Sequence, residues 1–370
     1  MNVSFELFNR QDDAVRNGLP ASVYLDPEFF DLENETLFSS SWVFVGFAHE
    51  LASPGDVCPV TVAGKPFLLV RNEEREITAF HNVCRHRCLQ LVDQPRNAGR
   101  LITCPYHSWT YGLDGSLKAA PYFSGKERRT ADLSFEDRGL VSVRCETWHD
   151  WIFINIDGSA MAFDDFVAPL RKQLGEVSLD EIVPVATLEF GNLKTNWKGL
   201  MENFIEPYHV QFVHKTTTTQ PLVDHFTVME DHCLGSACDI EDAKSVDETG
   251  TLAVTSRFLT LFPNFVMGTY APDQIGVHLN CPVDEGTTSQ RRVIYLHKDN
   301  DADTEQIQKI SDLWYDVHKE DHEICVRLQI GRKSSVAGDG GILSPHWEDS
   351  VRRFQELVVE SVGRPAADKY

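Results

Sequence analysis

Apolar and polar positions alternate over short stretches between residues 41 and 158, and breaks rich in Pro, Gly and Asn separate these stretches. Alternation over four to eight residues is typical of half-buried β-strands. We therefore predict a small antiparallel β domain over residues 41–158, and we expect residues 1–40 to pack on the rest of the chain. The predicted strands are Trp42–Phe47, Val57–Val62, Phe67–Val70, Ile77–Phe80 and Trp151–Ile156.

The pattern changes at about residue 159, where longer elements begin. Apolar residues recur at three- and four-residue steps in 303–331, which predicts an amphipathic helix. A second helix is predicted over 345–362, with Ser344-Pro345 as its cap and first-turn proline. Residues 159–370 thus predict a second domain, a curved antiparallel sheet with helices, and the fold class is α+β. The other elements predicted there are a helix over Asn196–His214 and strands at Ala186–Leu193, 252–260, 264–271, 274–281 and 290–297.

The composition argues against nucleic acids and anionic membranes as partners. The chain has 370 residues and a formal net charge of −22, whereas nucleic acids and anionic membranes bind clusters of Lys and Arg. It contains no run of eighteen apolar residues and no secretory signal pattern. Its nine cysteines follow no regular spacing, which indicates reduced thiols and a cytoplasmic location.

Two short Cys/His pairs carry the strongest chemical signal. Cys84-Arg85-His86 is followed, after seventeen residues, by Cys104-Pro105-Tyr106-His107. Two thiolates and two imidazoles are the ligands of a Rieske 2Fe–2S cluster, in which Cys holds one iron and His the other. A structural zinc also takes two Cys and two His, but its usual spacings pair Cys with Cys and His with His. The mixed pairs therefore favour the cluster, with zinc as the alternative.

A second candidate metal site lies in the predicted helix 196–214. On a regular helix, His209 and His214 would be about 140° apart around the axis and could not share an ion. Pro207 breaks or bends the helix just before them, which lets the two imidazoles converge. Two His and one carboxylate form the facial triad of non-haem Fe(II) oxygenases, which leaves positions open for dioxygen and substrate. The alternative is an ordinary pair of surface or packing histidines.

The late helix offers three carboxylates for this triad. Asp321 follows Val317 by four residues and shares its face with Ile324, Cys325 and Leu328, so we expect it to point inward. A buried Asp needs a partner, and a bound cation is one. Asp321 is the first choice as ligand. Glu320 and Glu323 fall more to the side and follow in that order.

With both constellations located, the chain resembles the oxygenase (alpha) component of Rieske non-haem iron oxygenases. The resemblance extends over nearly the whole chain and includes CxH, CPYHxW, NWK…EN…YHxxxxH and an ED…Q-G segment. It implies a Rieske domain and a helix-grip catalytic domain. It assigns Cys84, His86, Cys104 and His107 to the cluster, His209, His214 and Asp321 to a mononuclear iron, and Asn203 to the catalytic residues.

The resemblance also implies an assembly. Members of this family form ring-shaped trimers, in which the cluster of one subunit passes electrons to the iron of its neighbour through an Asp. Glu206 stands at that position here, and it keeps two acceptor oxygens. An ordinary solvated helix carboxylate is the alternative for Glu206. Because the chain lacks a dinucleotide fingerprint and plant-type ferredoxin spacing, we expect a separate reductase with flavin and NAD(P)H sites.

The substrate is less well defined by the sequence. Glu206 and the chain length are similar to the carnitine oxygenases, so the leading expectation is monooxygenation of a small carnitine- or betaine-type molecule with C–N cleavage or demethylation. An aromatic-acid ring hydroxylase is the alternative within the class. A non-catalytic electron carrier or a zinc-stapled binding protein is the alternative outside it. Six aromatic residues could form a cage for a trimethylammonium group, although such spacing is more typical of core: Phe204, Tyr208, Phe212, Phe265, Tyr270 and Trp314.

Overall fold

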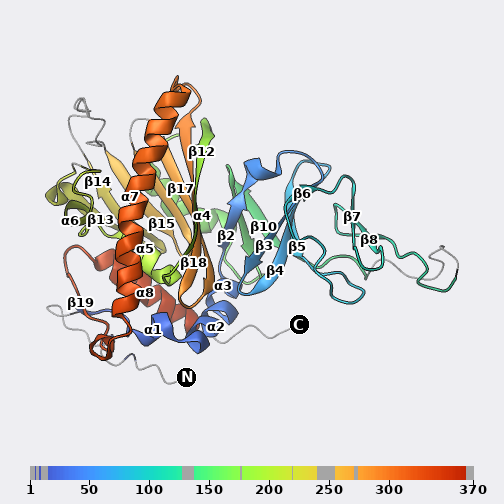
Figure 1. Ribbon diagram of the computed structural model, residues 1–370, viewed down its shortest axis with the longest axis horizontal. Coiled ribbons are helices and arrows are strands. Elements are labelled where there is room, and N and C mark those ends of the chain that lie inside the picture. Colours follow the sequence, from blue (N-terminus) through green and yellow to red (C-terminus); the bar gives the residue numbers. More distant parts are fainter. Residues whose placement is uncertain are drawn as a thin grey trace. The chain divides into compact units, whose positions relative to one another are not determined.

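The structure is a computed structural model that describes residues 5, 8–9, 16–126, 137–175, 177–218, 220–239, 255–270 and 274–363. The chain divides into two compact units (Figure 1). One comprises Phe38–Phe163, and the other comprises Met1–Leu37 together with Asp164–Tyr370. None of the helices in the described part of the chain combines the length and hydropathy that a membrane span needs.

Among its described residues, the Phe38–Phe163 unit is all β apart from a turn of 3₁₀-helix at Ala48–Leu51, the end of the short helix α3 (Leu37–Ser40) and the first residue of α4 (Phe163–Leu174). A seven-stranded antiparallel sheet has the order β2-β11-β10-β5-β4-β3-β6, and a three-stranded sheet has the order β7-β8-β9. The five predicted strands are all present, with ends that differ by one or two residues. The strands are β2 Val43–Phe47, β3 Asp56–Val62, β4 Lys65–Arg71, β5 Ile77–His81, β6 Arg96–Asn97, β7 Leu101–Thr103, β8 Thr110–Gly112, β9 Leu117–Ala119, β10 Ser142–Trp148 and β11 Trp151–Asn155.

The larger unit is built on a seven-stranded antiparallel sheet of order β12-β18-β17-β16-β15-β14-β13. Helices α5, α7 and α8 pack against its strands, which confirms the predicted class of antiparallel sheet with helices. The strands are β12 Ile182–Leu193, β13 His225–Glu230, β14 Cys233–Cys238, β15 Ser256–Leu261, β16 Phe265–Tyr270, β17 Gln274–Asp284 and β18 Thr287–His297. The helices are α1 Ser22–Leu25, α2 Pro27–Glu35, α4 Phe163–Leu174, α5 Trp197–Ile205, α6 Val210–Val213, α7 Thr304–Gly331 and α8 Asp349–Val362, and a small pair of strands joins β1 Arg16–Asn17 to β19 Ile342–Leu343.

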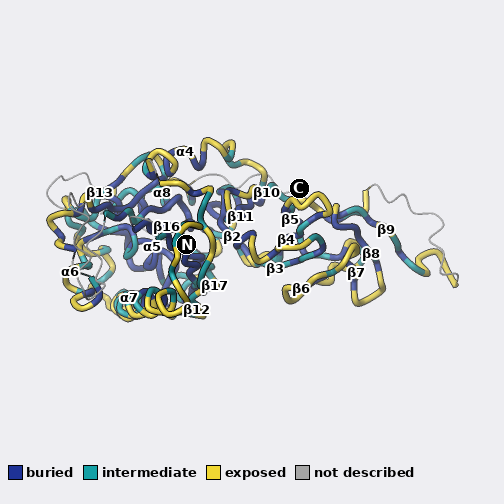
Figure 2. The backbone as a smooth tube through the Cα atoms, turned by 90° about the horizontal axis from the view of Figure 1, so that it is seen from above, coloured by how far each residue is buried: buried dark blue, intermediate teal, exposed yellow. Residues whose placement is uncertain are grey.

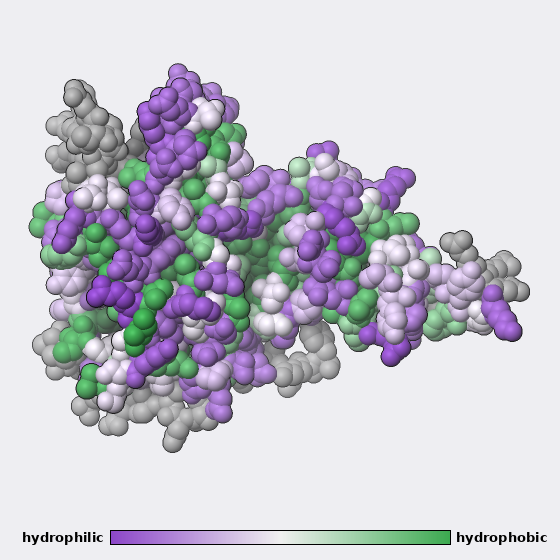
Figure 3. Space-filling view, in the orientation of Figure 1, coloured by the Kyte–Doolittle hydropathy of each residue, from purple (hydrophilic) through white to green (hydrophobic). Residues whose placement is uncertain are grey.

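Helix α7 begins one residue after the predicted start. Asp303 accepts a hydrogen bond from the Gln306 backbone, and the Gln306 side chain accepts one from the Asp303 backbone, so a capping box fixes this end. The outer side of α7 is exposed (Figure 2) and mainly hydrophilic (Figure 3). Leu328 lies at the edge of the buried face and is 46% exposed, so its assignment to the inward face was wrong. Gln329 is the buried residue at that turn.

The predicted start of the last helix was also wrong. Residues 345–347 form a turn, and α8 begins at Asp349. The Ser344 hydroxyl accepts from the backbone N–H groups of His346 and Trp347, which stabilises this turn instead of a helix start. The strand predicted at 252–260 is observed from Ser256, and its first residues 252–254 lie outside the described part, as does residue 271 of the next strand.

A buried ion pair holds α2 against α5 within the larger unit. Lys198 Nζ donates to Glu33 Oε1 over 2.7 Å, and Trp197 Nε1 donates to Glu33 Oε2 over 3.1 Å. Both charged side chains are fully buried. Burial raises the pKa of Glu33 and lowers that of Lys198, while each partner opposes the shift of the other. This contact fixes the start of α5, where Asn196 caps the helix by accepting from the Lys198 backbone.

Candidate metal centres

The two Cys/His loops of the β unit have matching backbones. Cys84 N donates to Leu89 O and Cys88 N donates to Cys84 O, over 2.8 and 3.0 Å. Cys104 N donates to Trp109 O and Ser108 N donates to Cys104 O over the same distances. The fifth residue of each loop has a positive φ, 57° at Cys88 and 58° at Ser108. The chain therefore folds twice into the same tight turn, although the histidine comes second after the cysteine in one loop and third in the other.

The cysteines lie inside and the histidines outside. Cys84 and Cys104 are buried, whereas His107 is exposed and His86 is partly exposed. The two imidazole rings are 4.6 Å apart between centroids, and the His86 ring stacks on the buried Trp109. This arrangement gives a cluster a buried thiolate side and an accessible imidazole side.

A hydroxyl lies against one of the thiols. Tyr111 Oη accepts from the Arg85 backbone N–H over 2.9 Å and lies 3.3 Å from Cys84 Sγ. Since its lone pair receives the Arg85 N–H, its own hydrogen is free to point at the sulfur. Cys88 is exposed on the same loop, so it serves the turn and is not a packing residue.

The four residues do not surround one ion. Among the described residues, only His209, His214 and Asp321 bring three potential ligand atoms within 4.8 Å of one another. A tetrahedral zinc would require that proximity of the Cys/His set. Ligands of a two-iron cluster are spread over two metals, so the wider spacing is the one expected for 2Fe–2S.

In the larger unit, the predicted break after α5 is present. Helix α5 ends at Ile205, Glu206 is extended with φ −111° and ψ 139°, and Pro207 follows. The short helix α6 then begins after His209 and ends before His214, so the two histidines flank a single turn. Their rings come within 5.3 Å between centroids. The proline thus converts a five-residue spacing that diverges on a helix into two converging imidazoles.

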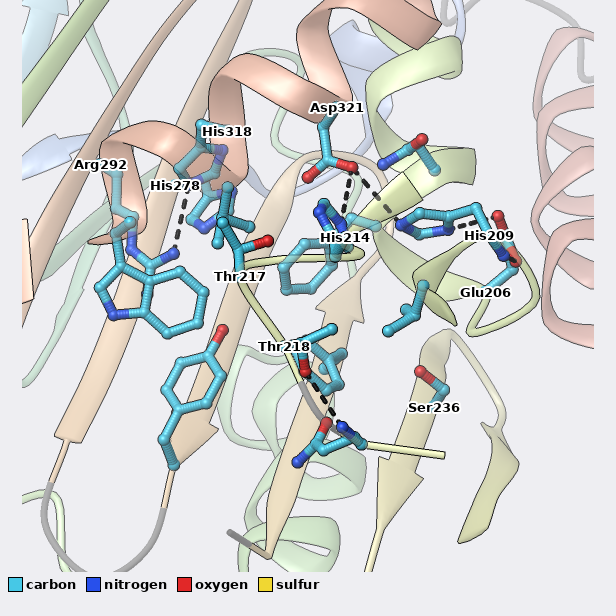
Figure 4. A pocket seen from close by; sticks show the side chains of 18 residues that line it. Glu206, His209, His214, Thr217, Thr218, Ser236, His278, Arg292, His318 and Asp321 are labelled. Atoms are coloured by element: carbon cyan, nitrogen blue, oxygen red, sulfur yellow. Dashed lines mark hydrogen bonds and ion pairs between the residues drawn. The ribbon is translucent and has the colours of Figure 1, made fainter. Parts of the chain in front are cut away.

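Three acceptors converge at this point without a proton between them (Figure 4). Asp321 Oδ1 lies 3.4 Å from His209 Nε2 and 3.1 Å from His214 Nε2. His209 Nδ1 lies 2.6 Å from Glu206 Oε1, and His214 Nδ1 lies 2.8 Å from Glu320 Oε2. Carboxylates only accept, so each Nδ1 carries a hydrogen, and in the neutral imidazole each Nε2 then keeps a lone pair. Asp321 Oδ1 accordingly has no hydrogen-bond partner among the described residues. A cation is the group that fits between these atoms.

The charges around the triad also favour a bound cation. Burial by itself lowers the pKa of His209, but the Glu206 and Asp321 carboxylates outweigh it and raise that pKa to about 10. Burial lowers the pKa of His214, whereas Asp321 and Glu320 raise it. The net effect is an increase in this pKa. Burial raises the pKa of Asp321, yet the two imidazoles hold it well below its ordinary value. The site is thus strongly cation-seeking, and protons or a metal ion satisfy it.

The three candidate carboxylates of helix α7 therefore have different contacts. Asp321 points at the two histidines, as predicted. Glu320 accepts from His214 Nδ1 and from the Thr217 hydroxyl over 2.7 Å, so it supports a histidine from behind. Glu323 is 74% exposed and pairs only loosely with Arg327. Sequence spacing could not reveal the Glu320 contact, because it joins residues 106 positions apart.

A pocket opens beside the triad. Asn203 and Glu206 line it together with His209, His214 and Asp321. Of the six aromatics considered for a cage, Phe204, Tyr270 and Trp314 line the pocket. The others do not: Phe265 is core, and Tyr208 and Phe212 are 43% and 56% exposed.

Sequence reasoning missed several polar residues in this pocket, among them His278 on β17, Arg292 on β18 and His318 on α7. A signal for one of them exists in the sequence. Arg292 has the same parity as Ile294 and Leu296, so it occupies an inward position of a largely apolar strand. A charged residue at such a position indicates a partner or a ligand.

Comparisons with known proteins agree with the geometry. Residues 41–129 match the family model "Rieske [2Fe-2S] domain", and residues 172–364 match "Ring hydroxylating alpha subunit (catalytic domain)". The carnitine monooxygenase oxygenase subunit of Escherichia coli K12 is 30% identical over 355 residues, which cover 92% of this chain and 93% of that protein. The glycine betaine monooxygenase oxygenase subunit of Chromohalobacter salexigens is 34% identical over 208 residues, covering 56% of this chain and 45% of that protein.

A solved quaternary ammonium Rieske monooxygenase, described for carnitine oxidation and inter-subunit electron transfer, has a TM-score of 0.80. It is 25% identical and covers 95% of this chain and 96% of its own. The predicted Rieske cluster and mononuclear iron are thereby confirmed as the cofactors, and an oxygenase as the class. The chain belongs to the Rieske non-haem iron oxygenases, as an alpha subunit of the ring-hydroxylating family.

Proposed function

We propose that this protein is a monooxygenase for a small quaternary ammonium compound of the carnitine or betaine type. The observation that carries the proposal is the cation-seeking triad, with two Nε2 lone pairs and Asp321, at the wall of a pocket lined by aromatic side chains. Relatives that carry the names carnitine monooxygenase and glycine betaine monooxygenase support the substrate class.

We assign the ligands as follows. Cys84, His86, Cys104 and His107 hold the cluster in a Rieske domain of residues 41–158. His209, His214 and Asp321 hold the iron in a catalytic domain of residues 159–370, on which the segment 1–40 packs. When bound, the cluster supplies single electrons and the iron activates dioxygen.

Glu206 and Glu320 keep both imidazoles in the tautomer that leaves Nε2 free. This orientation of a ligating His by a carboxylate raises its basicity as a ligand. Asn203 lines the same pocket and is placed to orient the bound molecule.

Glu206 is also the proposed bridge between subunits. Its Oε1 accepts from His209 Nδ1, and its Oε2 accepts from the His209 backbone over 3.1 Å, which leaves acceptor capacity on a side chain that is 12% exposed. His107 is exposed on the cluster loop, and an imidazole that ligates iron through one nitrogen would keep on the other the N–H that such an acceptor needs. A trimer in which the cluster of one subunit faces the iron of the next would join the two. The relative described for inter-subunit electron transfer supports this assembly.

Alpha subunits of this family work with a separate reductase, and we propose that it carries flavin and binds NAD(P)H. Two electrons and two protons then reduce one atom of dioxygen to water, while the other atom is inserted into a C–H bond of the substrate. Insertion beside a quaternary nitrogen gives an alcohol that breaks into an amine and an aldehyde.

A substrate panel tests the proposal. The holoenzyme with a reductase is given L-carnitine, γ-butyrobetaine, glycine betaine, choline, benzoate and salicylate, and oxygen-dependent products are quantified. We expect amine and aldehyde from at least one quaternary ammonium compound. Hydroxylation of the aromatic acids alone would overturn the proposed substrate class, and the aromatic lining of the pocket makes that the relevant alternative.

A further inference from the structure

Arg292 is a buried cation in the pocket that has no anion beside it. It is 1% exposed and lines the pocket from β18. Its Nη1 lies 3.2 Å from His318 Nε2, which must be the acceptor because a guanidinium only donates. Its Nε and Nη2 have no acceptor in good hydrogen-bond geometry within the part of the chain that the structure describes, although the neutral Tyr270 hydroxyl lies close enough to act on the guanidinium charge.

Trp314 on α7 and Gly276 on β17 form a closely fitting site for this guanidinium, which we call its seat. Its Cζ lies 3.8 Å from the centre of the Trp314 ring, and Trp314 is held by a hydrogen bond from its Nε1 to Gln274. On β17, a Cβ at Gly276 would lie 2.1 to 2.4 Å from the Arg292 guanidinium. Only a residue without a side chain allows the guanidinium to lie there. Strand and helix thus hold Arg292 in one place.

Among the described residues that line the pocket, no carboxylate is left to neutralise Arg292. Its two acidic residues, Glu206 and Asp321, are engaged with His209 and His214. A buried charge without a counter-ion costs considerable stability, and it persists at functional sites where a ligand supplies the opposite charge. The neighbouring imidazoles do not substitute for such a ligand. Burial and the Arg292 charge lower the pKa of His318, which stays neutral.

Arg292 and the triad lie on opposite sides of the pocket. Figure 4 shows Arg292 with His278 and His318 on one side and Asp321 with the two metal-site histidines on the other. The Trp314 face is covered by Arg292, so it is not free to enclose a trimethylammonium group. A ligand that spans the pocket therefore meets a positive group at one end and the reaction centre at the other.

We propose that Arg292 binds a carboxylate of the substrate and thereby selects zwitterionic betaines over quaternary ammonium alcohols such as choline, which lack a carboxylate. This inference rests on the proposed function and narrows it. The Nε and Nη2 donors, which no anion of the described residues satisfies, form one edge of the guanidinium fork, which matches the two oxygens of a carboxylate. Binding there directs the quaternary nitrogen of a carnitine-type molecule toward the triad.

Arg292→Met is the direct test, with Arg291→Met as matched control. Arg291 is the next residue on β18 and faces the other side of the sheet. KM and kcat are measured with the holoenzyme and reductase for γ-butyrobetaine and for its amide, which keeps the trimethylammonium charge but lacks the carboxylate charge. In Arg292→Met we expect KM for the acid to rise about 30-fold or more with a smaller change in kcat, the lower end of the cost of losing a buried charge partner. The amide should be almost unaffected, and the control should behave as wild type.

Gly276→Ala tests the seat independently of the arginine. The added methyl displaces the guanidinium, so it should raise KM for the acid in the same direction. In the Arg292→Met background the same change should add nothing, because no guanidinium remains to be displaced. Additive effects would overturn the role of the seat.

An unchanged KM for the acid, or equal losses for acid and amide, would overturn the assignment of Arg292, as would a wild-type enzyme that prefers choline. Failure of the proposed function has a different signature. If wild type oxidises benzoate and no quaternary amine, the substrate class is wrong, and benzoate against benzamide still tests Arg292.

Discussion

Glu320 offers a sharp test because the sequence made it a candidate ligand and the structure places it behind a histidine. Its Oε2 accepts from His214 Nδ1 over 2.8 Å and from the Thr217 hydroxyl over 2.7 Å. Replacing it with Gln keeps an acceptor oxygen at that place but removes the negative charge. Replacing it with Ala removes both hydrogen bonds. Neither change touches an atom that we assign to the metal.

The size of the effect follows from these contacts. Loss of a partner behind a ligating histidine costs roughly 10- to 100-fold in metal affinity, which is about 1.4 to 2.7 kcal/mol. Glu320 is 29% exposed, so solvent screens part of its charge. The Gln variant also keeps an acceptor for both donors. We therefore expect Glu320→Gln to weaken Fe(II) binding about 10-fold and Glu320→Ala about 100-fold.

The assay is an anaerobic Fe(II) titration of cluster-loaded protein against a competing chelator. Glu323→Gln is the control, since Glu323 is on the same helix and exposed, and it should bind iron as wild type does. Asp321→Ala should lose the mononuclear iron while the cluster spectrum stays intact. If Glu320→Ala abolishes iron binding and Asp321→Ala does not, the ligand assignment is wrong.

Three further expectations follow from the two centres. Glu206→Gln should bind both metals and keep a reducible cluster. The reduced cluster should nevertheless persist when oxygen and substrate are added, because the amide replaces an acceptor with a donor. Rapid reoxidation of the cluster coupled to product formation would show that Glu206 is not on the electron path. Tyr111→Phe should lower the reduction potential of the cluster by roughly 40 mV, since a hydrogen bond of about 1 kcal/mol to the Cys84 sulfur stabilises the reduced form. A redox titration measures this potential. An unchanged potential would show that the hydroxyl does not donate to the sulfur. Purified protein should be brown and contain about three irons per chain, whereas a colourless protein with stoichiometric zinc would contradict the cluster.

Much of the fold was predictable because local pattern and tertiary structure agree. Alternation located the strands of the β unit, and the three- and four-residue steps located α7 within one residue. The errors occurred where local chemistry has two outcomes. Ser344-Pro345 suits a helix start but forms a turn here, and Leu328 fits the apolar period but lies at the edge of the buried face.

The same division applies to the site. Pro207 predicted that His209 and His214 converge, because a proline has a local consequence for the helix. The contacts of Glu320 with His214, and the seat that Gly276 gives to Arg292, join strands and helices distant in sequence. Such contacts depend on strand register and helix placement, which residue spacing does not determine.

A single-turnover experiment tests the central claim most directly. The purified protein, loaded with cluster and iron, is chemically reduced, freed of reductant, and mixed with γ-butyrobetaine and oxygen in the absence of a reductase. We expect the amine and aldehyde products to form in step with reoxidation of the cluster, and no product from Asp321→Ala protein. Full reoxidation of the cluster without product from any compound of the panel, or equal product from the Asp321→Ala protein, would contradict the account.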